Sequence, residues 1–326
     1  MRISTLIITA AVSFAVTAAV GAILVPILRA LKAGQPIADI GPTWHKTKEG
    51  TPTMGGLMFI AGMVAAVVLA GARWVGKGEH SHIFILLFGA IFAAIGVVDD
   101  AAKLRKKRNL GLTARQKFFL QLAAAVFFVV TMQFTGKLSE SFFIPFANVT
   151  LALPKPLYLP FAAFIIVASV NAVNITDGLD GLAAGVTLPA AVSCAAIAFA
   201  RGNAAPGFAA SALAGALVGF LLYNFHPAKV IMGDTGALFL GAVICAVTFA
   251  LDMPLIIVPL GVIYIIETLS DIVQIIYYKK TKGKRLLKMA PIHHHFEMCG
   301  WSEYKIVGVF TGVSAVFAVI SYFAAV

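Results

Sequence analysis

The chain has 326 residues, of which 60% are hydrophobic and only 12% are charged, and its mean hydropathy is +0.94. A soluble domain carries about a quarter charged residues, so this composition excludes an ordinary soluble enzyme and predicts a polytopic helical membrane protein. The formal net charge of +11 does not indicate nucleic-acid binding here, because basic residues beside apolar segments are the usual cytoplasmic anchors of membrane helices.

Ten apolar segments follow one another along the chain, each with the length and composition of a membrane helix. They are residues 3–28, 54–72, 83–98, 118–134, 157–170, 182–200, 208–222, 237–251, 255–278 and 306–326. No soluble stretch of domain size separates them. We therefore expect one all-α membrane domain with ten transmembrane helices over residues 1–326.

Charged residues are unevenly divided between the two sides of these segments. Of the 25 Lys and Arg residues, 19 lie in the connections after odd-numbered segments and 6 on the opposite side. The positive-inside rule then predicts that both termini are extracytoplasmic. Of the 14 acidic residues, only Glu79, Glu140 and Asp252 fall outside the cytoplasmic side. Because acidic residues do not follow that rule, their excess indicates a cytoplasmic metal or phosphate site.

The first cytoplasmic connection ends in KEGTPTMGG, where Pro52 and the glycines predict a turn into the second segment. Exposed backbone N–H groups at a helix start suit phosphate, and Lys48 and Thr53 offer further donors. A membrane helix capped by Thr fits this short pattern equally well.

Two adjacent carboxylates, Asp99 and Asp100, end the third apolar segment. Charge repulsion and desolvation both disfavour this placement, and a helix C-terminus disfavours anions. A helix end that simply reaches water is the alternative interpretation. Lys103 would lie on the same face if the helix continues, and Lys117, which opens the next segment, could face a phosphate.

The stretch NAVNITDGLDGL joins the fifth and sixth segments and contains no Lys or Arg. Asn171, Asn174 and Asp177 recur every three residues and therefore share a helical face. Gly178 and Gly181 allow the backbone to approach a ligand closely. The spacing does not fit a calcium-binding EF-hand loop, so we favour a polar ligand site over a plain turn.

The sequence GDTG enters the eighth segment and places Asp234 near a helix start. A carboxylate is favoured there because the backbone N–H groups of the first turn are unpaired. A lone capping Asp is the alternative.

The ninth segment carries Glu267, Asp271 and Gln274 on one helical face, which should line a cavity and not face lipid. Pro259 and Gly261 predict a bend in this segment.

The connection after the ninth segment ends in PIHHHFE, with three consecutive histidines. Adjacent side chains rarely chelate one ion, so we favour phosphate or sugar binding over zinc. The acidic, amide, lysine and histidine positions all fall on the cytoplasmic side. Hard oxygen ligands beside phosphate-binding groups predict Mg²⁺, a phosphorylated substrate and a phosphoryl-transfer site at the membrane surface.

Five motifs, GTPTMGG, VVDDAAK, NAVNITDGLDGL, NFHPAKVIMGDTGAL and PIHHHFE, resemble those of the polyprenyl-phosphate N-acetylhexosamine-1-phosphate transferases. They occur in the family's order and span the chain from Lys48 to Glu297. GTPTMGG and PIHHHFE are similar to the branch that uses UDP-N-acetylmuramoyl-pentapeptide.

The resemblance implies a Mg²⁺-dependent homodimer in the bacterial cytoplasmic membrane, with its active site on the cytoplasmic face. The donor would react with undecaprenyl phosphate to give lipid I and UMP in peptidoglycan synthesis. Together with Pro259 and Gly261, the resemblance also implies an apolar groove open to lipid beside the bent ninth segment.

The resemblance also implies roles for individual residues. The catalytic positions would be Asp99, Asp100, Asp234 and His293, with Asp234 and Asp100 as metal ligands. The substrate-binding positions would be Lys48, Thr53, Lys103, Lys117, Asn171, Asn174, Asp177, Gly178, Leu179, Asp180, Asn224, Gln274, His294 and His295. Direct attack by the lipid phosphate and a covalent aspartyl-phosphate route both stay open.

Three other functions compete with this one. A sister transferase would use UDP-N-acetylglucosamine, and PIHHHFE argues for the muropeptide donor instead. An ion-coupled transporter would also carry intramembrane carboxylates, but the chain has no evident inverted repeat. A structural lipid-binding protein would leave Asp99, Asp100 and Asp234 without a task.

Overall fold

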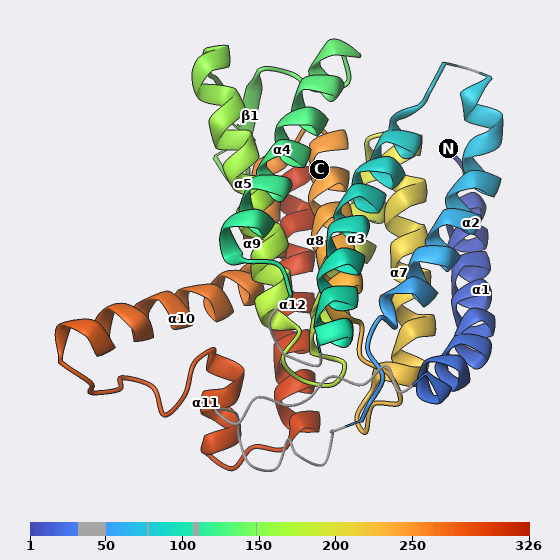
Figure 1. Cartoon of the computed structure of the whole chain (residues 1–326). Coiled ribbons are helices and arrows are strands. Elements are labelled where there is room, and N and C mark those ends of the chain that lie inside the picture. Colours follow the sequence, from blue (N-terminus) through green and yellow to red (C-terminus); the bar gives the residue numbers. More distant parts are fainter. Residues whose placement is uncertain (32–49, 77, 107–110, 148) are drawn as a thin grey trace.

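The computed structural model describes residues 1–31, 50–76, 78–106, 111–147 and 149–326 (Figure 1). This part of the chain is nearly all helical. Its long helices are α1 (Ile3–Ala30), α2 (Gly56–Val75), α3 (Ser81–Lys106), α4 (Ala114–Phe134), α5 (Lys155–Thr176), α6 (Leu182–Ala200), α7 (Ala204–Asn224), α8 (Gly233–Ala250), α10 (Val262–Lys280) and α12 (Glu303–Ala325). The short elements are β1 (Ser141–Ile144), β2 (Val149–Ala152), the 3₁₀ helix η2 (Pro254–Ile256), α9 (Ile257–Leu260) and α11 (Ile292–Met298).

The predicted multi-pass helical membrane protein is confirmed. Eight of the described helices are long and apolar enough to cross a membrane, and a bent pair raises the number to as many as nine. The apolar part of α2, Gly56–Ala72, is shorter than these. The expected tenth crossing and the sidedness of the termini stay predictions.

The predicted bend in the ninth segment is confirmed. The helical turns of Pro254–Leu260 meet α10 at 77°. Pro259 lacks the backbone N–H that would continue the helical hydrogen bonds, and Gly261 stands at the junction with φ −98° and ψ 23°. Figure 1 shows the consequence, because α10 projects sideways from the bundle. The expected apolar groove beside it stays a prediction.

Helices α7 and α8 form the centre of the bundle. In each, 83% of the most apolar stretch is buried, compared with 28% in α1. Helices α3 and α5 pack against α8, while α1 and α6 pack against α7. Both central helices are rich in Ala and Gly, which let neighbouring backbones approach closely. The first turn of α8 is therefore enclosed by other helices.

A short hairpin that the sequence did not indicate joins α4 to α5. Strand β1 pairs antiparallel with β2, with Ser141 opposite Ala152. In Figure 1 both termini lie toward the end of the bundle that carries this hairpin, and α11 lies at the opposite end. This arrangement agrees with the expectation that the two termini share one side.

Candidate active site

Three carboxylates from two helices meet at the start of α8. The sequence predicted that the third segment ends at Val98, but α3 continues to Lys106 and carries Asp99 and Asp100 in a helical turn. Helix α8 begins at Gly233, which places Asp234 in its first turn as predicted. Because α3 packs along α8, one oxygen from each carboxylate lies within 4.8 Å of the others.

The close packing of α3 on α8 depends on Gly96. A Cβ at this position would collide with the backbone carbonyl of Asp234 and the backbone nitrogen of Thr235. Gly96 stands one turn before Asp99 and Asp100 on α3. The missing side chain therefore brings the carboxylates of α3 next to the first turn of α8.

Asp100 is fully buried and caps α8. Its Oδ1 accepts a hydrogen bond from the Asp234 N–H at 3.2 Å, and its Oδ2 accepts from the N–H and the hydroxyl of Thr235 at 2.9 and 2.7 Å. The first backbone N–H groups of a helix have no partner within the helix, and its N-terminus favours an anion. Asp100 therefore has a structural task as well as its predicted chemical one.

Asp234 is surrounded by donors. The ammonium groups of Lys103 and Lys117 lie 3.0 and 2.8 Å from its Oδ2, and the Asn174 amide donates to its Oδ1 at 2.9 Å. These residues come from three different helices, α3, α4 and α5. The structure thus brings together four residues that the sequence predicted for the site.

Asp99 is buried beside the other two carboxylates. Lys103 lies 2.7 Å from its Oδ2, which confirms that the two residues share a helical face. Its Oδ1 accepts a hydrogen bond from the Leu112 N–H at 2.7 Å. Lys103 therefore bridges Asp99 and Asp234.

The charges of this cluster suit a divalent cation and an anionic substrate. Three carboxylates and two ammonium groups give a formal charge of −1, which one Mg²⁺ ion would convert to +1. Octahedral Mg²⁺ at about 2.1 Å separates its oxygen ligands by roughly 3.0 to 4.2 Å. One oxygen of each carboxylate lies within 4.8 Å of the others, an upper limit slightly above this range, and the all-oxygen donor set is the type that Mg²⁺ prefers.

Thr53 lies next to this cluster. The backbone around it pairs with the segment before α8, since Ile231 donates to the Pro52 carbonyl and Gly55 donates to the Ile231 carbonyl. Thr53 is buried, and its hydroxyl has no hydrogen-bond partner among the described residues. Lys48 lies outside the described residues.

The predicted polar stretch after the fifth segment is partly helical. Helix α5 extends to Thr176, so Asn171 and Asn174 belong to the helix and Asp177 follows its last residue. Asn174 reaches Asp234, whereas the Asn171 amide donates to Gln121 and to its own helix at 2.7 Å. The structure therefore connects only Asn174 of the two amides to the carboxylate cluster.

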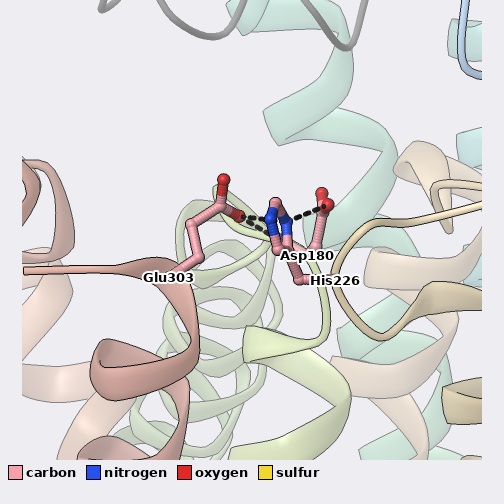
Figure 2. Close-up of side chains that lie close together, drawn as sticks. All are labelled: Asp180, His226 and Glu303. Carbon is pink, nitrogen blue, oxygen red and sulfur yellow. Dashed lines mark hydrogen bonds and ion pairs between the residues drawn. The ribbon is translucent and has the colours of Figure 1, made fainter.

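The loop that follows α5 is tied to two other segments through Asp180 (Figure 2). Its Oδ2 lies 3.0 Å from the His226 Nδ1 and accepts a hydrogen bond from the Ala228 N–H at 3.0 Å. Glu303, at the start of α12, lies 3.5 Å from the same His226 nitrogen and accepts from the Asp180 N–H at 3.3 Å. The loop with Gly178, Leu179 and Asp180 is thus held from both sides.

Asn224 fastens the same loop to the segment before α8. It accepts a hydrogen bond from the Gly181 N–H at 3.0 Å and donates to the Val230 carbonyl at 2.9 Å. Its amide therefore joins two backbone segments that border the site.

The three histidines lie on α11, a helix that the sequence did not predict. The His293 Nδ1 lies 2.9 Å from Glu267 of α10, and the His294 Nδ1 lies 2.6 Å from Glu297 of α11. His295 accepts a hydrogen bond from the Lys288 N–H at 3.1 Å. Each histidine thus has a different partner, an arrangement unlike a shared zinc site.

Gln274 holds the basic segment that precedes α11. Its amide accepts hydrogen bonds from the Leu286 and Leu287 N–H groups at 3.1 and 3.0 Å and donates to the Leu287 carbonyl at 3.1 Å. Gln274 was predicted to bind substrate, and in the structure its amide is engaged with this backbone.

Sequence reasoning missed several residues that contact the predicted ones. Glu267 was placed on a cavity-facing helix side but not assigned to the site. The others include Gln121, His226, Thr235, Glu297 and Glu303. His226 and Thr235 both lie within the motif NFHPAKVIMGDTGAL. Their place in this motif was the only feature of the sequence that pointed to them.

Comparisons with known proteins show the family of the chain. Residues 82–252 match the model for glycosyl transferase family 4, and residues 48–60 match the first phospho-N-acetylmuramoyl-pentapeptide-transferase signature. The matched ranges include Thr53, the three carboxylates and the loop after α5.

Similar full-length proteins bear the same name. The chain is 44% identical over 326 residues to the phospho-N-acetylmuramoyl-pentapeptide-transferase of Clostridioides difficile, covering 99% of each chain. It is 42% identical over 323 residues to that of Listeria welshimeri, covering 98% of each, and 41% identical over 314 residues to that of Clostridium acetobutylicum, covering 95% of this chain and 96% of the relative. The chain therefore belongs to the phospho-N-acetylmuramoyl-pentapeptide-transferase family.

Proposed function

We propose that this protein transfers phospho-N-acetylmuramoyl-pentapeptide from its UDP conjugate to undecaprenyl phosphate, giving lipid I and UMP in peptidoglycan synthesis. The full-length similarity to transferases of this name supports the assignment. The observation that carries the chemistry is the position of Asp234, which lies among two other carboxylates and two lysines. Such a cluster suits a reaction between two phosphates at a membrane surface.

In this reaction an oxygen of the lipid phosphate attacks the phosphorus that carries the sugar. A new phosphorus–oxygen bond forms, the bond to the UMP oxygen breaks, and UMP leaves with that electron pair. The lipid phosphate is already an anion near neutral pH, so Asp99 serves mainly to orient it or to accept a remaining proton. Lys103 and Lys117 place positive charge where the diphosphate would lie.

We assign Mg²⁺ to the carboxylate cluster, with Asp234 and Asp100 as ligands. When bound, the ion supplies positive charge that neutralises the diphosphate and its leaving oxygen. Both oxygens of Asp100 also accept hydrogen bonds from the start of α8. Asp99 offers the third oxygen of the same cluster.

The remaining site residues are assigned to the two substrates. Lys48, Thr53 and Asn174 lie on the phosphate side in this proposal, and His293, His294 and His295 on the phosphate and sugar side. The family resemblance implies that Asn174 and residues 177–180 form the nucleoside end of the donor site. We keep residues 177–180 there and place Asn174 on the phosphate side, because its amide donates to Asp234. Asn171, Asn224 and Gln274 hold the surrounding backbone or contact substrate.

We further propose a single domain with ten membrane crossings, extracytoplasmic termini and a homodimeric assembly in the bacterial cytoplasmic membrane. The ten apolar segments and the excess of Lys and Arg in one set of connections support this topology.

The test is release of UMP by the purified protein with UDP-N-acetylmuramoyl-pentapeptide, undecaprenyl phosphate and Mg²⁺. Asp234→Ala should abolish release, while Glu140→Gln, which removes a carboxylate from an exposed ion pair elsewhere, should leave it unchanged. Turnover of UDP-N-acetylglucosamine alone would refute the proposed donor. Full activity of Asp234→Ala would refute the metal assignment.

A further inference from the structure

Glu267 of α10 and His293 of α11 form a buried pair. The Glu267 Oε2 lies 2.9 Å from the His293 Nδ1, and the two residues are 0% and 1% exposed. A carboxylate beside Nδ1 accepts a hydrogen bond from the N–H of that nitrogen, so Nε2 is the ring atom left for another partner. The pair therefore fixes both the position of the imidazole and the role of its second nitrogen.

Two atoms of this pair lack the partners that burial normally demands. The Glu267 Oε1 and the His293 Nε2 are both enclosed, and neither has a hydrogen-bond partner among the described residues. An unsatisfied buried polar atom destabilises the folded state. Two apolar side chains would join α10 to α11 without this cost. The orphaned Nε2 thus indicates a task beyond joining the two helices.

The unpartnered nitrogen faces the loop after α5. A Cβ at Gly178 would collide with the His293 Nε2 and Cε1, so the imidazole edge occupies the space that a side chain would fill. Gly178 stands between Asp177 and Asp180 in the loop assigned above to the nucleoside end of the donor. The pair thus connects α10, through α11, to that loop.

We propose that Glu267 is a positioning residue of the transfer site, which holds His293 by Nδ1 so that Nε2 faces the loop that binds the nucleotide-sugar donor. This inference rests on the proposed function. Gly178 is required for this arrangement, because only a residue without a side chain leaves room for the edge of the His293 imidazole. Glu267 acts through His293 and does not itself touch the donor.

The test compares initial rates of UMP release at varied donor concentration for Glu267→Gln, Gly178→Ala, His293→Gln and the double variant Glu267→Gln/His293→Gln. Glu267→Gln should lower kcat/KM by roughly tenfold to a hundredfold, because an amide does not fix the imidazole tautomer. Gly178→Ala should cause a loss of similar size. The double variant should be no slower than His293→Gln, since Glu267 acts only through that ring.

Glu140→Gln is the control, because it removes a carboxylate from an exposed ion pair with Lys155 far from the proposed site. It should keep the activity of the unsubstituted protein. Thermal unfolding of each variant separates loss of positioning from loss of fold, and a pH profile of kcat/KM should change shape in Glu267→Gln but not in Glu140→Gln.

Two results would overturn the positioning role. One is unchanged kcat/KM in Glu267→Gln, and the other is a double variant whose loss is the product of the two single losses. Absence of UMP release by the unsubstituted protein would count against the proposed function instead. Calorimetric binding of UMP still tests the pair in that case, since weaker binding by Glu267→Gln and Gly178→Ala supports the role and unchanged binding refutes it.

Discussion

Replacing Asp100 by Ala should lower the stability of the folded protein as well as abolish its activity. Asp100 is fully buried and accepts three hydrogen bonds from the first turn of α8. Removing the carboxylate leaves the N–H groups of Asp234 and Thr235 buried without an acceptor. Activity lost in Asp100→Ala therefore reports on folding as well as on chemistry.

The magnitude follows from these contacts. Each stranded backbone donor costs about 1 to 3 kcal/mol, and relief of repulsion with the two neighbouring carboxylates returns roughly 1 kcal/mol. The expected net loss for Asp100→Ala is about 1 to 5 kcal/mol, or roughly 2 to 7 °C in Tm for a chain of this size. Asp100→Asn keeps one acceptor oxygen and should lose about half as much.

The assay is thermal unfolding in detergent, followed by tryptophan fluorescence, for the unsubstituted protein and for Asp100→Ala, Asp100→Asn and Glu140→Gln. Glu140 belongs to an exposed ion pair with Lys155, so its variant should unfold within about 1 °C of the unsubstituted protein. An Asp100→Ala variant that is inactive yet unfolds at the unsubstituted temperature would refute the capping role and leave Asp100 with a purely chemical task.

Three further predictions concern metal binding, helix packing and pH. Asp234→Asn should abolish binding of Mn²⁺, used as a paramagnetic substitute for Mg²⁺ and measured by electron paramagnetic resonance; unchanged binding would move the metal elsewhere. Gly96→Ala should weaken Mn²⁺ binding and lower Tm together, because its Cβ would collide with the Asp234 backbone, and unchanged values for both would refute the close packing. Burial by itself would raise the pKa of Glu79, but hydrogen bonds from Ser81 and Lys137 outweigh it and lower the pKa to about 2. The ionised carboxylate therefore stabilises the folded protein fully at pH values above 4.5, the pKa of an unperturbed Glu. This stabilisation is lost as the pH falls toward 2. Glu79→Gln should therefore lower stability by at most about 1 kcal/mol at pH 7, since the pair is partly exposed, and a Tm difference that persists at pH 2 would contradict this account.

Local features of the sequence predicted much of the fold. Apolar segments of membrane length reveal the helices, because every backbone polar group in a bilayer must bond within its own segment. Pro259 and Gly261 predicted the bend before α10, since the loss of one N–H and of one side chain acts on the local backbone. GDTG predicted the start of α8, since a carboxylate is favoured in the first turn of a helix.

The sequence was less informative where a helix ends. Val98 was predicted to end the third segment, but Asp99 and Lys103 pair across one turn and α3 continues. The histidines of PIHHHFE were treated as a loop, yet they form α11, where Glu267 and Glu297 hold His293 and His294. Hydropathy locates the apolar part of a helix. It does not show where polar residues continue the helix, because side-chain contacts stabilise that part.

The motifs alone identified most residues of the candidate site and the family to which the chain belongs. They could not say which of those residues meet, because Asp100 and Thr235, or Lys117 and Asp234, are more than a hundred positions apart and become neighbours only when α3, α4 and α8 pack together. Packing likewise turned Asn171 toward Gln121 while Asn174, one turn away, reached Asp234. The local sequence thus determines which reactive side chains the protein has. Which carboxylate caps α8, which one pairs with the lysines and which one pairs with a histidine is decided by how the helices pack.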